Sequence, residues 1–259
     1  MIHAIKPALQ QVWPPADRPP DDVSPEHMAL AALRHEIDLL DDGILALFER
    51  RLAIAARVGR AKDAPAGPHL KLRPDREQAV LRRVVARAHP DNRDAVQALW
   101  REVVGHGLTR QGATRVQVWA PVEPVRAFDG ARRRFGGAAD IRLVGTPEVA
   151  LRWAAEGRGA AVLAINAGEP WWIELRRRWT SLTVFDGLGG VVPTALAVGK
   201  IDPAALPTGR QVLVSAGGDA GDGGGARRVG LATHHGWTLS LTDGPASVGG
   251  PEGCVGAVP

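Results

Sequence analysis

Two cations stand where apolar residues are expected on one helical stripe. From residue 33 to residue 58, apolar residues recur at alternating steps of four and three: Leu33, Ile37, Leu40, Ile44, Leu47, Ile54 and Val58. This repeat is typical of a helix that buries one stripe against other helices. The remaining positions of the stripe hold Arg51 and Lys62. A cation on a buried seam is unfavourable unless an anion meets it, so the pair predicts an anion bound between helices.

Three helices in the first 112 residues must position these cations. A long helix is expected from Ser24-Pro25, with Ser24 as N-cap, to about Lys62. Shorter helices are expected at about 74–89 and 94–111. A long helix with one apolar stripe needs partners along its whole length.

Alternating strands and helices are predicted after Gly112, which indicates a small α/β domain. The expected strands are 116–119, 141–144, 160–165, 183–185, 195–198, 211–214 and 237–241, and the expected helices are 128–135, 147–156 and 171–179. The predicted fold class is therefore α+β and multidomain. The predicted divisions are a flexible Pro-rich arm (1–25), an all-α domain (26–112), an α/β domain (113–242) and a flexible tail (243–259).

Composition narrows the class of protein. The 32 Lys+Arg and 28 Asp+Glu residues give a net charge of +4, without a basic tract typical of nucleic-acid binding. The single cysteine, Cys254, excludes an intrachain disulfide. The sequence has no apolar run of membrane-spanning length, and its start lacks the apolar core of a secretory signal. These features predict a cytoplasmic protein that binds neither nucleic acid nor membrane.

Other candidate motifs favour structural roles. His234-His235 has no acidic or cysteine partner at metal-ligand spacing, so a surface turn is expected and no metal. The Gly-rich stretch 217–225 lacks the Gly-Lys-Ser/Thr ending of a phosphate loop and is expected to be a flexible loop. Trp171-Trp172 is interpreted as core or interface packing.

The helical region resembles the AroQ-type all-helical chorismate mutases. The resemblance covers about residues 28–112 and rests on LRHEIDLLDDGILALFERRLAIAARVGRAK (33–62), on RPDRE (73–77) and on Gln111. It implies a homodimer of intertwined helices that rearranges chorismate to prephenate, without a cofactor, in phenylalanine and tyrosine biosynthesis. The substrate is a dicarboxylate, which fits the anion that the stripe predicts.

The resemblance also implies a role for each matching residue. Arg51 would bind a substrate carboxylate through both of its terminal nitrogens. Lys62 and Gln111 would donate to the ether oxygen, on which negative charge develops in the transition state. Arg34 lies off the stripe and would reach into the partner subunit's site.

Three further assignments fall near the start of the second helix. Glu77 would accept a hydrogen bond from the substrate hydroxyl, with Arg76 in the same ionic network. Arg73 matches a position that contacts substrate largely through its backbone.

Gly107 stands where the family often has a small hydroxyl residue, and Gly105 with Gly107 is expected to weaken the third helix.

The second domain carries a weaker resemblance. The phrases FDGARRRFG, TPEVALRWAAEGRGAAVLAI and ALAVGK look like a reduced prephenate dehydratase lobe. The Thr-Arg-Thr/Ser motif of that family is missing, so a remnant without dehydratase activity is expected, one that binds a ligand or supports the dimer. Two alternatives stay open. Beside the leading hypothesis of a chorismate mutase, the chain could be a bifunctional mutase–dehydratase or a helical dimer scaffold with a small-molecule-sensing domain.

Overall fold

The computed structural model describes residues 25–61, 70, 72–112, 115–165, 168–216, 228–244, 248 and 253–259. The expected arm before Pro25, the N-cap Ser24, Lys62 and the Gly-rich stretch 217–225 lie outside the described residues. The chain divides into two compact units, residues 1–54 and 55–259. The second unit contains two helices of the expected all-α domain as well as the sheet. The division expected after residue 112 stays a prediction about sequence domains.

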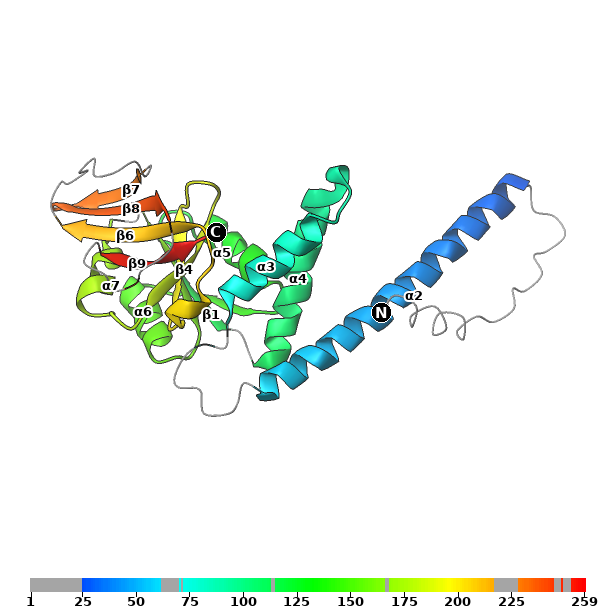
Figure 1. Ribbon diagram of the computed structural model, residues 1–259, viewed down its shortest axis with the longest axis horizontal. Helices are drawn as coiled ribbons and strands as arrows, with labels where there is room; N and C mark the ends of the chain where they lie inside the picture. Colours follow the sequence, from blue (N-terminus) through cyan, green and yellow to red (C-terminus); the bar gives the residue numbers. More distant parts are fainter. Residues whose placement is uncertain are drawn as a thin grey trace. The chain divides into compact units, whose positions relative to one another are not determined.

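The long predicted helix is present as α2 (Pro25–Ala61), and its expected last residue, Lys62, lies outside the described residues (Figure 1). Its apolar stripe is not buried within the chain. The seven apolar side chains of the stripe, from Leu33 to Val58, are between 42% and 67% exposed, with Leu40 the most exposed. The expectation of a buried stripe is therefore wrong for a single copy, because an apolar face of this length needs a second surface to cover it.

The next two helices form a hairpin. Helix α3 (Pro74–Val85) is followed by the short 3-10 helix η1 (Pro90–Asn92) and by α4 (Arg93–Gln111) (Figure 1). Helix α4 packs directly on the C-terminal end of the next helix through Gly105. A Cβ atom at Gly105 would lie 2.5 Å from the carbonyl oxygen of Phe135 and 2.9 Å from the Cα of Gly136. The sequence analysis expected Gly105 to weaken α4. In the structure, the absence of a side chain at Gly105 permits this contact.

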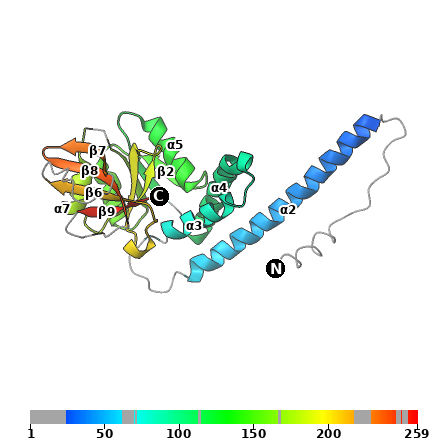
Figure 2. The ribbon, with the colours of Figure 1, turned by 45° about the horizontal axis from the view of Figure 1, so that its top comes forward.

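The described residues contain one sheet of nine strands, in the order β2-β1-β3-β5-β4-β9-β6-β8-β7. Strands β1, β2 and β3 are parallel, and β5 is antiparallel to both β3 and β4. Strands β9, β6, β8 and β7 lie side by side in the other half of the sheet (Figure 2). The strands are β1 (Arg115–Trp119), β2 (Asp140–Leu143), β3 (Ala160–Ala164), β4 (Thr183–Leu188), β5 (Ala195–Gly199), β6 (Arg210–Ala216), β7 (Arg228–His234), β8 (Trp237–Asp243) and β9 (Cys254–Val258).

Helices cover both faces of the first half of the sheet. Helix α5 (Pro124–Phe135) packs with Val116 and Val118 of β1, whereas α6 (Pro147–Ala155) packs with the side chains that point the other way, such as Trp119. This alternation follows from the two-residue period of a strand. Strand β3 is apolar throughout because both of its faces are covered.

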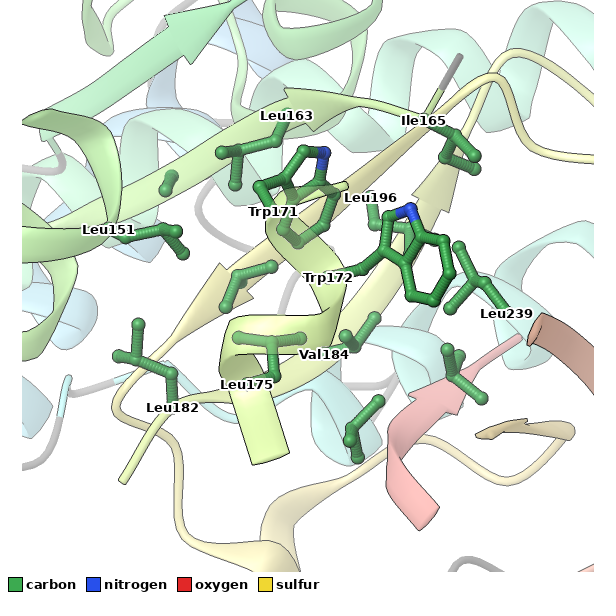
Figure 3. Close-up of a cluster of buried hydrophobic side chains, with 14 of the residues drawn as sticks. Leu151, Leu163, Ile165, Trp171, Trp172, Leu175, Leu182, Val184, Leu196 and Leu239 are labelled. Atoms are coloured by element: carbon green, nitrogen blue, oxygen red, sulfur yellow. The ribbon is translucent and has the colours of Figure 1, made fainter. Parts of the chain in front are cut away.

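Trp171 and Trp172 lie at the centre of the core beside α6, as the sequence predicts. Their exposed fractions are 3% and 1%, and leucine, isoleucine and valine side chains surround them (Figure 3). The indole Nε1 of Trp171 donates to the carbonyl oxygen of Ala164 at 2.7 Å. The helix predicted at 171–179 is present as a 3-10 turn, η2 (Trp171–Ile173), followed by the short α7 (Glu174–Arg177). Another 3-10 turn, η3 (Pro203–Ala205), precedes β6.

The sequence analysis missed two strands, β7 and β9. Strand β9 is buried between β4 and β6, so the expected flexible tail is wrong for residues 254–258. Gly256 has a φ of +154°, and any Cβ atom there would collide with the carbonyl oxygen of Val184.

None of the helices among the described residues combines the length and the apolar character needed to cross a membrane.

Candidate functional site

Two of the predicted cations lie on α2, in the first unit. Arg34 is exposed, as expected for a residue off the apolar stripe. Arg51 is half-buried, and this burial lowers the pKa of its guanidinium by removing water from the charged group. An arginine remains charged at neutral pH even so. Lys62 follows the last residue of α2, Ala61, and is outside the described residues.

The last turn of α2 contacts the end of α4. A Cβ atom at Gly59 would lie 2.7 Å from the Cα of Gln111 and 2.9 Å from its carbonyl oxygen, so only glycine fits. Gln111 is the last residue of α4, and its Nε2 donates to the carbonyl oxygen of Gly107 at 3.3 Å. Gly59 precedes Lys62 by three positions in the sequence. The structure thus places Gln111 beside the last turn of α2.

The start of α3 carries an exposed ion pair. Arg73 donates to Asp75 through both Nε (3.0 Å) and Nη2 (2.7 Å). The hydrogen bond from Arg73 lowers the pKa of the Asp75 carboxyl. Arg76, on the same turn, is exposed. The side chain of Arg73 is thus engaged with its own helix, which agrees with a role through the backbone.

Glu77 points instead toward the sheet. It is 8% exposed, and its Oε2 accepts a hydrogen bond from Nη1 of Arg134 at 2.7 Å. Arg134 lies on α5, and its Nε donates to Oδ2 of Asp186 on β4. Burial alone would lower the pKa of Arg134, but the charges of Glu77 and Asp186 outweigh it and raise that pKa.

The other oxygen of Glu77 has a different environment. Oε1 is buried and has no hydrogen-bond partner among the described residues. A cavity of about 340 Å³ lies beside Glu77, between α3, α4 and β4. Arg101 of α4 also lines this cavity, and burial lowers the pKa of its guanidinium.

Sequence reasoning missed Arg101, Arg134 and Asp186. Arg134 belongs to the run Arg132–Arg134 on an amphipathic helix, and such a run is usually a solvated face. The two carboxylates that Arg134 contacts, Glu77 and Asp186, lie 57 and 52 residues away from it in the chain, so no local pattern connects these side chains.

The remaining candidates have structural surroundings. His235 has a φ of +43° and follows β7 in the turn to β8, so the predicted surface turn is confirmed. Within the part of the chain that the structure describes, no three His, Cys, Asp or Glu side chains form a group that could hold a metal ion. Cys254 is buried in β9, and its Sγ donates to the carbonyl oxygen of Gly256 at 3.4 Å.

The chorismate mutase type II family model matches residues 33–112. The matched region comprises most of α2, with α3 and α4, and ends one residue after Gln111. No curated protein and no solved structure matches the chain. The helical region thus contains a chorismate mutase type II domain, and the sheet region follows it. The resemblance of the sheet region to a dehydratase lobe stays a prediction.

Proposed function

We propose that the protein is a chorismate mutase, which rearranges chorismate to prephenate in phenylalanine and tyrosine biosynthesis. The observation that carries this proposal is the match of the family model to residues 33–112, which include the predicted site residues. The contact of Gly59 with Gln111 supports it, because it brings one predicted donor beside the turn that leads to the other, Lys62.

The reaction needs no nucleophile and no proton transfer. The ether C–O bond breaks while a C–C bond forms, and negative charge develops on the ether oxygen. Lys62 and Gln111 would donate to that oxygen, which stabilises the transition state more than the ground state. Arg51 would hold a carboxylate and favour the compact conformer that reacts.

The apolar stripe of α2 supports a homodimer. Burial of a large apolar side chain contributes about 1.5–3 kcal/mol, and the stripe exposes several of them in a single chain. A second copy has the same stripe and can cover it symmetrically. In this dimer Arg34 would enter the site of the partner, as the resemblance implies.

The test is the disappearance of chorismate, followed by ultraviolet absorbance with the full-length protein, and acid conversion of the prephenate formed. Arg51→Ala and Lys62→Ala are each expected to lower kcat about 100-fold or more, because each removes a fixed donor to substrate. Arg50→Ala is the matched control, since Arg50 is an exposed neighbour on the same helix. Full activity in both site variants would refute the assignment.

A folded dimer that leaves chorismate unchanged would also refute it. The alternative of a helical scaffold with a small-molecule sensor would then lead. The folded state is checked by circular dichroism and the dimer by light scattering, so that loss of structure is not mistaken for loss of chemistry.

A further inference from the structure

We propose that Arg134, in the sheet region, is a positioning residue that holds Glu77 for its role in the mutase site. The inference rests on the proposed function, in which Glu77 accepts a hydrogen bond from the substrate hydroxyl. It assigns to the sheet region a direct part in the reaction of the helical region.

The buried groups around Glu77 balance one another in charge. Glu77 and Arg134 have side chains that are each 9% exposed, and Asp186 is 13% exposed. Two carboxylates in such a place do not both stay ionised unless cations compensate them. Arg134 contacts both, and Arg101 adds a further positive charge nearby. These four groups sum to zero charge, so Arg134 keeps Glu77 able to accept a hydrogen bond.

Arg134 also orients the carboxylate of Glu77. Arg134 occupies one oxygen of Glu77 and leaves Oε1 without a partner among the described residues. A buried acceptor without a partner is unfavourable, and a donor from a ligand would remove that penalty. The cavity of about 340 Å³ beside Glu77 is of a size that takes a small molecule. Because Oε1 is itself buried, the hydroxyl reaches it only after neighbouring side chains shift.

The side chain of Arg134 is itself held in place by its neighbours. The guanidinium of Arg134 lies 5.1 Å from the ring centre of Phe135 and 5.8 Å from that of Phe185. Asp186, its second anchor, also accepts from the backbone N–H of Gly187 at 2.8 Å, where β4 shifts register against β5. Arg134 is thus fixed from several sides, as a residue that positions another must be.

The charged groups that line the cavity with Glu77 are Arg82, Arg101, Arg134, Asp186 and Arg210. Of these, the cation with a hydrogen bond to Glu77 is Arg134. Its removal leaves Glu77 close to the negative charge of Asp186 in a buried place. Without Arg134, no hydrogen bond among the described residues orients the carboxylate of Glu77, so the step to which Glu77 contributes should slow.

The test compares Arg134→Met with Arg133→Met in the full-length protein. Arg133 is an exposed neighbour on the same helix, so its variant has the same change in charge. We expect Arg134→Met to lower kcat about tenfold or more while KM changes less, because Glu77 is still present but is no longer held in place. Arg133→Met should keep the wild-type kcat and KM. Arg134→Lys keeps the charge and should recover part of the lost kcat, but not all of it, because one ammonium cannot hold both carboxylates.

Removal of one partner from a buried ion pair can strongly destabilise the fold, because it leaves the other charge buried without compensation. The double variant Arg134→Met/Asp186→Asn removes one positive and one negative charge, so it should fold where the single variant does not. We expect it to lower kcat at neutral pH, since Glu77 still lacks its anchor. Circular dichroism melting curves identify the variants that are folded.

The outcomes separate the two proposals. If the wild-type protein does not convert chorismate, the proposed function fails and this inference fails with it. If the wild type is active and folded Arg134 variants keep its kcat and KM, only the inference fails. Higher activity in Arg134→Met would overturn it as well, by showing that Arg134 withholds Glu77 from the substrate.

Discussion

The exposed ion pair between Arg73 and Asp75 should contribute little to stability. Arg73→Ala should raise the pKa of Asp75 toward its ordinary value, because the hydrogen bond that lowers it is lost. A carboxyl with a depressed pKa stabilises the fold above its unfolded pKa, and that contribution disappears as the pH falls through the folded pKa. The side chains are 54% and 30% exposed, so we expect a loss of only about 0.2–1 kcal/mol at pH 7.

NMR titration of Asp75 measures the pKa, and urea unfolding at pH 7 and near pH 2 measures the stability. Chorismate turnover should be unchanged, because the proposed role of Arg73 lies in its backbone. An equal loss of stability at both pH values would show that the variant removes something other than this pair.

Burial makes the pair between Glu77 and Arg134 different in kind. The two exposed side chains of Arg73 and Asp75 remain in water when separated, whereas Glu77 would be left as a charge away from water. The resemblance predicted Glu77 as a site residue, and no pattern in the sequence predicted its partner. The sequence indicates residue types and local spacing, but the contact of α5 with α3 joins residues that are 57 positions apart in the chain.

At the scale of elements, the close approach of α4 to α5 can be tested at Gly105. Alanine in place of glycine normally stabilises a helix interior by about 1 kcal/mol. Gly105→Ala should instead destabilise by about 1–3 kcal/mol, because its Cβ would meet the main chain of Phe135 and Gly136. Gly145→Ala is the control, since no atom lies within 4 Å of its Cβ position. Urea unfolding measures both, and a gain of stability in Gly105→Ala would contradict the packing described here.

The helices and strands differ in how well their sequences indicate them. Helix α2 has a long periodic pattern with Pro25 at its start, and its predicted end is within one residue of the observed one. Strand β9 has the sequence CVGAV, with Gly256 at its centre, and follows a stretch rich in glycine and proline. Such a segment has weak strand propensity. It becomes a strand because β4 and β6 supply hydrogen-bonding partners on both sides, and these lie far away in the chain.

At the scale of the whole molecule, the exposed apolar stripe of α2 is the feature on which the proposed homodimer depends. A sequence pattern reports that a face must be covered, but it does not report by what. The expectation that the stripe of α2 is buried was wrong for one chain, and it is compatible with a pair of chains. If the partner also supplies Arg34, neither copy has a complete site alone, and activity becomes a property of the assembly.

This sharing predicts complementation between inactive variants. In a mixed dimer of Arg34→Ala and Arg51→Ala, one site combines the intact Arg51 of one chain with the intact Arg34 of the other, and the second site lacks both. Random reassociation makes half of the dimers mixed, so the mixture should regain about a quarter of the wild-type activity. Arg51→Ala mixed with Lys62→Ala is the control: each chain supplies both residues to its own site, so every site stays defective. Chorismate turnover after joint refolding measures the result. If the first mixture stays inactive while mixed dimers form, Arg34 does not act in the partner's site.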